Sequence, residues 1–119
     1  MNENDLRWRT KQFALRVIKL SNSLPKNQVG RVLGSQLLRS GSSVGANYRS
    51  ACRARSAAEF LSKLGIVVEE ADESIYWLEL IVDSGLVNKT RMQEILQEAD
   101  ELTAIFTRSI LTAKNRSLK

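Results

Sequence analysis

The sequence predicts an all-α protein, an antiparallel four-helix bundle of up-down-up-down connectivity, and three observations lead to this fold class. The chain has 119 residues, which is enough for one domain with its own core. It contains one proline and six glycines, too few to separate several strands. Apolar residues recur at helical spacing in four segments, and the short links between them make consecutive helices neighbours.

The first helix is expected over residues 5–22 and the second over residues 26–54. Asn4 or Asp5 can cap the first helix, and Pro25 disfavours helical geometry at the residue before it. Small residues lower the intrinsic helicity of the second helix, so we expect another helix to approach it closely in compensation. The residues expected to face the core are Leu6, Phe13, Val17, Leu20 and Leu24, then Val29, Leu33, Leu37, Ser40, Val44, Asn47 and Ala51.

The third helix is expected over residues 57–84 and the fourth over residues 90–114, which completes one domain of residues 1–119. Ser56 and Glu59 have the spacing of a capping box, and Gly85 suits the left-handed conformation that ends a helix. Asn88 or Thr90 can cap the fourth helix. The core stripes are Phe60, Leu64, Val67, Ala71, Ile75, Leu78 and Val82, then Met92, Ile95, Ala99, Leu102, Phe106, Ile110 and Ala113.

Two helices carry more apolar surface than one core face needs. The extra residues are Trp8, Leu15 and Ile18 on the first helix, and Ile66, Tyr76, Trp77 and Leu80 on the third. A helix that is apolar on two faces is buried on two faces, so we expect a homo-oligomer in which Trp77 is an assembly residue. The alternative is that these are ordinary scattered exposed side chains. Asn47, on the inward stripe, is expected to make a side-chain hydrogen bond and to fix the register of packing.

Charge is segregated along the chain. Residues 25–55 contain six basic residues and no acid, whereas residues 56–87 contain seven acids and one lysine. Either these two helices neutralise one another, or the arginines stay free to bind phosphate. We favour the first interpretation, in which Arg39, Arg49 or Arg53 meets Glu69, Glu70 or Glu73. Arg39, Glu69 and Glu73 are then residues of structure and assembly.

The formal net charge of +5 and the pI of about 9.7 favour an anionic partner, with nucleic acid first. If the second and third helices neutralise one another, the remaining positive charge lies near the two ends of the chain, where Lys11 and Lys119 are also found. We expect the nucleic-acid contacts to be Arg7, Arg9, Arg16, Lys19, Arg108, Lys114 and Arg116. The alternative function is an oligomeric protein-interaction scaffold that binds no nucleic acid.

The chain lacks residues that several kinds of catalytic and metal-binding chemistry require. The chain has no histidine, which excludes Ser-His-Asp and Cys-His pairs and the Glu-x-x-His di-iron bundle. With Cys52 as the one cysteine, a zinc site of usual composition and an internal disulfide are excluded as well. We therefore predict no catalytic, metal or cofactor-binding residue, no cofactor and no enzymatic activity. No apolar run approaches the ~18 residues of a membrane span, so we expect a cytoplasmic protein without membrane contact.

Several short motifs together resemble one protein family. They are Leu24-Pro25, Ser35-Gln36-Leu37-Leu38-Arg39-Ser40, Ser43-Val44-Gly45-Ala46-Asn47, Arg55-Ser56 and Glu59-Phe60. They are similar to the signature of the four-helix-bundle proteins, also called intervening-sequence proteins because some are encoded within insertions in large-subunit ribosomal RNA genes. The resemblance implies a ring-shaped homopentamer. Through a relative, the accessory variability protein of diversity-generating retroelements, it also implies binding to nucleic acid and to a reverse transcriptase.

The chain departs from that family pattern at one point. Members often read Asn-Ile-Ala-Glu-Gly where this chain reads Asn47-Tyr48-Arg49-Ser50-Ala51. The acid and the glycine are both missing. No role of that glutamate is therefore carried over to this chain.

Overall fold

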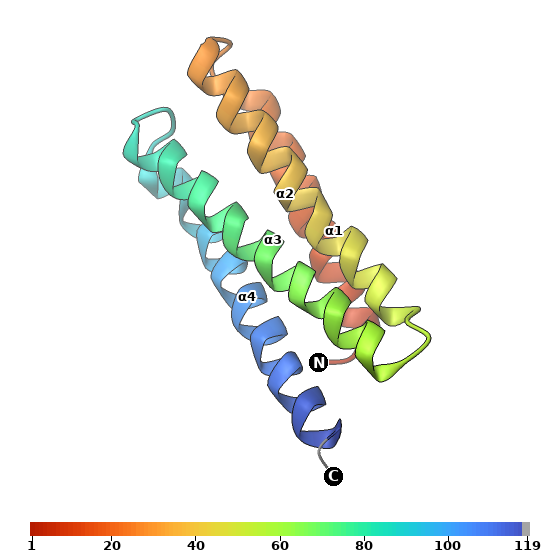
Figure 1. Ribbon diagram of the computed structural model, residues 1–119. Helices are drawn as coiled ribbons and strands as arrows, with labels where there is room; N and C mark the ends of the chain where they lie inside the picture. Colours follow the sequence, from red (N-terminus) through yellow and green to blue (C-terminus); the bar gives the residue numbers. More distant parts are fainter. Residues whose placement is uncertain (118–119) are drawn as a thin grey trace.

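The computed structural model describes residues 1–117, which form four helices and no strand (Figure 1). Each turn returns the chain along the preceding helix, so α1 packs on α2, α2 on α3 and α3 on α4, while α1 and α4 meet more sparsely. The molecule is elongated, with extents of 51 × 22 × 20 Å. The predicted all-α fold of four helices is confirmed; Lys119 lies outside the described residues. The helices are α1 (Glu3–Ser23), α2 (Gln28–Cys52), α3 (Ala57–Asp83) and α4 (Lys89–Ser117).

Side-chain caps set the first residue of the helices. The Asn2 side chain accepts from the Asp5 N–H at 2.9 Å, and the Asp5 carboxylate accepts from the Asn2 N–H at 3.2 Å. The expected cap at Asn4 or Asp5 was therefore wrong, because this reciprocal pair starts α1 earlier and places Asp5 inside the first turn. Asn27 caps α2 and Ser56 caps α3, each with a side-chain oxygen that accepts a first-turn N–H.

The turn between α3 and α4 has the geometry predicted for it. Gly85 has a φ of +80°, in the left-handed region where glycine has no steric penalty. The Leu86 N–H donates to the Ile81 carbonyl at 3.2 Å, which closes the last turn of α3 in a Schellman arrangement. The Asn88 side chain accepts from the Thr90 N–H at 2.8 Å, so Asn88 caps the start of α4.

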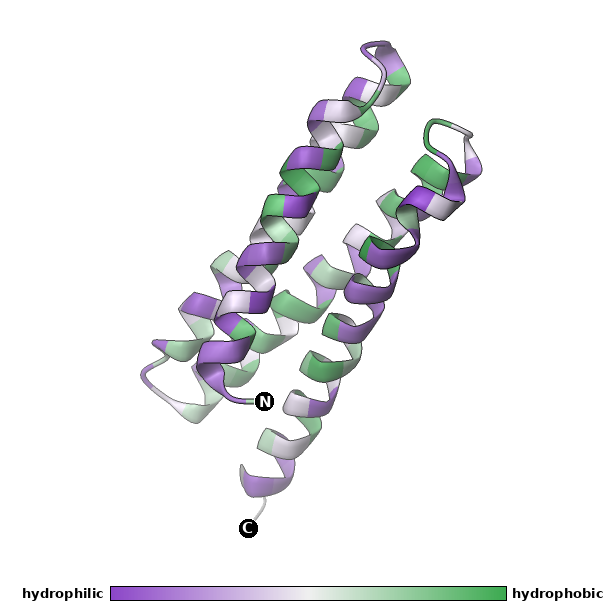
Figure 2. Cartoon of the chain, turned by 180° about the vertical axis from the view of Figure 1, so that it is seen from behind, coloured by the Kyte–Doolittle hydropathy of each residue, from purple (hydrophilic) through white to green (hydrophobic). Residues whose placement is uncertain are grey.

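The core runs between the helices, and hydrophobic residues recur along all four of them (Figure 2). Most predicted core positions are buried, but Val29 is half exposed because Gly30 and Leu33 take the inward positions of the first turns of α2. Tyr48 is buried although it was not predicted to be, with its ring centroid 5.1 Å from that of Phe106. Across residues 1–117, no helix is long and apolar enough to cross a membrane.

The small residues of α2 allow close packing, as expected. A Cβ added at Gly41 would lie 2.8 Å from Cγ2 of Val17, so α1 packs directly on the α2 backbone there. On its other side α2 meets α3 through a polar contact inside the core. The Ser74 hydroxyl lies 2.9 Å from that of Ser40, and both side chains are fully buried. These two contacts fix the height of α1, α2 and α3 relative to one another.

Candidate nucleic-acid interface

The basic residues predicted to contact nucleic acid do not form one surface. α1 divides its cations between two sides, with Arg9 and Arg16 turned toward α4 and Arg7 turned toward α2. Both chain ends lie at one end of the bundle (Figure 1), and Lys19, at the far end of α1, lies at the other. Five of the seven candidate contacts therefore fall into three separate hollows, and Arg9 and Lys114 line none of the three.

Two of the predicted contact residues have acidic partners on α4. Nε of Arg9 donates to Glu98 at 3.0 Å, a second guanidinium nitrogen also bonds Glu98, and Glu101 lies at 3.3 Å. The hydrogen bond to Glu98 is the main cause that raises the pKa of Arg9. Arg16 lies 3.7 Å from Glu94 in a more exposed pair. Intramolecular carboxylates thus compensate both charges, which leaves them poorly placed to neutralise phosphate.

The first hollow is a groove of about 420 Å³ between α1 and α2. Arg7 and Lys11 from α1 and Arg49 from α2 line it, and none of its lining residues is an acid. Its floor is made of small residues, among them Ala14, Gly45 and Ala46, so a ligand backbone can approach the helices closely.

Sequence reasoning left Lys11 and Arg49 out of the contact set, although a helical wheel carries the signal. Residues 7, 11 and 14 share one side of α1. Arg49, considered as a partner for the acids of α3, lies instead on the α1 side of α2.

The second hollow lies between the end of α1 and the start of α4. It measures about 280 Å³ and is lined by Arg16, Lys19 and Arg91 over apolar Met92 and Ile95. Because Arg16 already pairs with an acid, Lys19 and Arg91 supply the uncompensated charge here.

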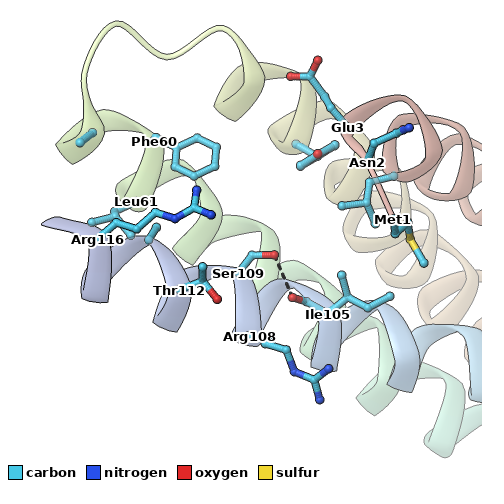
Figure 3. A pocket seen from close by; sticks show the side chains of 14 residues that line it. Met1, Asn2, Glu3, Phe60, Leu61, Ile105, Arg108, Ser109, Thr112 and Arg116 are labelled. Carbon is cyan, nitrogen blue, oxygen red and sulfur yellow. Dashed lines mark hydrogen bonds between the residues drawn. The ribbon is translucent and has the colours of Figure 1, made fainter.

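The third hollow, about 1090 Å³, lies at the end of the bundle that holds both termini (Figure 3). Arg108 and Arg116 belong to its rim, and its walls include the apolar side chains of Phe60, Leu61 and Ile105. Lys114 is exposed on α4 but does not line this hollow. The arginines here border an apolar surface, whereas the α1–α2 groove offers cations above small residues.

Arg39 was predicted to engage an acid of α3, and the structure places it beside two of them. Its guanidinium lies 3.2 Å from Glu70 and also contacts Glu73, which is the main cause that raises the pKa of Arg39. Glu69, named with them, is exposed and has no ion-pair partner within residues 1–117.

The other two predicted assembly residues are half-buried. Nδ2 of Asn47 donates to the Ser43 carbonyl at 2.8 Å, so its hydrogen bond stays within α2. Trp77 packs edge-to-face against Tyr76, with ring centroids 5.2 Å apart. The Trp77 indole nitrogen is buried and finds no acceptor among the described residues.

Two observations concern metal binding and the reactivity of the cysteine. No group of three or more Cys, Asp or Glu side chains in residues 1–117 gathers as a metal ion would require. Burial raises the pKa of the Cys52 thiol, and the nearby Glu3 carboxylate raises it further. A raised thiol pKa is the opposite of what activates a nucleophilic cysteine.

Comparison with known proteins agrees with this architecture. The chain matches the family model described as 23S rRNA-intervening sequence protein over residues 2–108. A similar solved structure is the crystal structure of a protein of unknown function from the S23 ribosomal protein family of Bacteroides thetaiotaomicron VPI-5482. It has a TM-score of 0.86 and 34% sequence identity, over 92% of this chain and 98% of that chain. No curated protein matches. The chain belongs to the 23S rRNA-intervening sequence protein family.

Proposed function

We propose that this protein is a non-enzymatic accessory protein that binds nucleic acid as a homo-oligomer. The α1–α2 groove carries the proposal, because Arg7, Lys11 and Arg49 converge there without an acid. Three cations above a floor of small residues suit a phosphodiester backbone, which is read by charge and not by base identity. We expect the protein to act in the cytoplasm on structured RNA or DNA, with little sequence preference.

Several copies of the groove in one oligomer should give a higher affinity for nucleic acid than a single subunit has. The family resemblance implies a ring of five up-down-up-down bundles, and five copies at +5 each bring about +25 onto one particle. Contacts from neighbouring subunits to one phosphate chain then add through effective concentration. On this basis we expect non-specific dissociation constants of about 10⁻⁴ to 10⁻⁶ M near physiological salt.

The test is a gel-shift or anisotropy titration of labelled RNA and duplex DNA over a series of salt concentrations. We expect binding that weakens steeply with salt. In the Arg7→Gln/Arg49→Gln double variant, the magnitude of the slope of log affinity against log salt falls by about 0.9 for each phosphate of the duplex that the protein no longer neutralises. The matched control is the Arg9→Gln/Arg16→Gln double variant, which also removes two positive charges, both of them partnered by carboxylates of the same chain. Melting curves of all variants check that the fold is retained.

Two results would overturn the proposal. If the unaltered protein at tens of micromolar retards neither RNA nor DNA at low salt, an oligomeric protein-interaction scaffold becomes the better function. A reverse transcriptase is then the first partner to try, as the resemblance implies. If the Arg9→Gln/Arg16→Gln variant weakens binding as much as the groove variant does, overall charge and not the groove is responsible.

A further inference from the structure

Two stripes of exposed apolar side chains remain after the core is packed. One lies on α1 and contains Trp8, Leu15 and Ile18, and the other lies on α3 and contains Ile66 and Tyr76. The half-buried Trp77 and Leu80 flank the second stripe. Exposed apolar side chains that share one helix face mark an interaction site more often than scattered ones do.

The two stripes lie on opposite corners of the bundle. α1 packs on α2 and α4, and α3 packs on the same two helices, but the backbones of α1 and α3 do not lie side by side within residues 1–117. The outer face of α1 is therefore directed away from that of α3. One copy cannot bring its own two stripes together, whereas two copies can.

The charges beside the stripes are of opposite sign. Lys11 and Lys19 flank the α1 stripe, and the exposed Glu69, Asp72 and Glu79 flank the α3 stripe. None of these five side chains forms an ion pair in the described part of the chain. Complementary potentials of this kind guide association and fix orientation.

The stripes also agree in spacing. Positions 8, 11, 15 and 18 of α1 repeat at three- and four-residue intervals, as do positions 66, 69, 73 and 76 of α3. α1 and α3 run in the same direction along the bundle, because two turns separate them (Figure 1). Side by side in that direction, Trp8 meets Ile66, Lys11 meets Glu69, Leu15 meets Glu73 and Ile18 meets Tyr76. In the oligomer the α1–α2 groove then keeps Arg7 and Arg49 as its cations without an acid.

The heights of the helices agree with the same register. Val17 packs on Gly41, and the adjacent Ser40 bonds Ser74, so Val17 and Ser74 lie at about the same height in the bundle. Ile18 and Tyr76 follow these two residues by one and two positions. Subunits related by rotation about an axis along the bundle keep their heights, and such a rotation brings Ile18 beside Tyr76.

We infer that the α1 stripe of one copy docks on the α3 stripe of a second copy of this chain. The inference rests on the homo-oligomer of the proposed function and names its interface. Because the two surfaces differ, the contact is head-to-tail, and it closes into a ring when the rotation permits. Docking also covers the half-buried Trp77 that flanks the α3 stripe.

The test uses two single variants and their mixture. Leu15→Asp places a charge in the α1 stripe and Tyr76→Asp places one in the α3 stripe, at side chains that are 49% and 55% exposed and so outside the core. Light scattering should give the oligomer mass for the unaltered protein and the monomer mass for each variant. In an equimolar mixture, the intact α1 stripe of the Tyr76→Asp chain meets the intact α3 stripe of the Leu15→Asp chain. We expect the mixture to form dimers and nothing larger.

The matched control is Leu111→Asp, at a 57% exposed leucine of α4 outside both stripes, which should assemble like the unaltered protein. The inference is overturned if either stripe variant keeps the oligomer mass, if the control also dissociates, or if the mixture stays monomeric. A mixture that stays monomeric points to a two-fold interface. Nucleic-acid titrations of the monomeric variants separate this inference from the proposed function. A monomer still has the α1–α2 groove but lacks the other subunits of the ring, so its binding should be weaker and still depend on salt.

Discussion

Gly41 and Gly65 form a matched pair that tests how closely α1 approaches α2. Both glycines lie inside helices, so replacing either with alanine should gain up to about 1 kcal/mol from helix propensity. At Gly65 nothing lies within 4 Å of the new Cβ, so that gain should appear in full. At Gly41 the new Cβ would lie 2.8 Å and 2.9 Å from the two γ-carbons of Val17.

Val17 cannot move away from that methyl group easily. It is fully buried, and its branched side chain has one strongly preferred rotamer in a helix. Overpacking of this kind costs about 1–3 kcal/mol. We therefore expect the free energy of unfolding of Gly65→Ala to exceed that of Gly41→Ala by about 1–3 kcal/mol. The gain from helix propensity is the same in both variants, so it cancels in this difference.

Urea titrations at one fixed protein concentration measure this difference, with thermal melts as a second readout. A gap of that size corresponds to several degrees in melting temperature for a domain of this length. If the two alanine variants were equally stabilised, α1 would not lie as close to α2 as the structure places it, and the argument from Val17 would be refuted.

Three further predictions concern other contacts. Ser40→Ala should lower the unfolding free energy by about 1 kcal/mol because it removes the buried bond to Ser74, while Ser42→Ala at the exposed surface should change it little in the same urea titration. Arg9→Gln should lower the free energy of unfolding by less than about 1 kcal/mol, because the Arg9–Glu98 ion pair is partly exposed. This loss of stability should become smaller as salt is added, since salt screens the pair. Burial raises the pKa of Cys52, so folding favours the protonated thiol; this contribution is complete below the thiol's pKa in the unfolded chain and is lost as pH rises through the folded value. Iodoacetamide at about pH 8.5 should therefore alkylate the folded protein more slowly than the urea-unfolded one, and equal rates would contradict the assignment.

Helix positions followed from the sequence because periodicity and turn residues act locally. Gly85 ends α3 as its type suggested, since the left-handed conformation depends on the residue itself. The start of α1 was misplaced because Asn2, Asn4 and Asp5 are all competent caps, and only the reciprocal pair in the structure decides between them. Val29 was assigned to the core because the apolar stripe was extended into the first turn of α2.

The candidate interface was harder to predict because it depends on which side of a helix meets which neighbour. Arg7 and Arg9 are two residues apart and lie on different sides of α1, one in a basic groove and the other beside carboxylates. The groove also needs Arg49, which joins Arg7 only after α2 packs on α1. Such a site combines residues far apart in the sequence, and the charge of each segment alone does not reveal it.

The order of helix contacts also has a kinetic consequence. Most tertiary contacts join consecutive helices, and the exception is the sparse edge between α1 and α4. Arg9 and Glu98, which bridge that edge, are 89 residues apart in the chain. Closing a long loop costs more entropy than forming a hairpin, and proteins rich in local contacts fold quickly. Folding is therefore expected to be fast, with three helix pairings that nucleate locally and an α1–α4 edge that closes late.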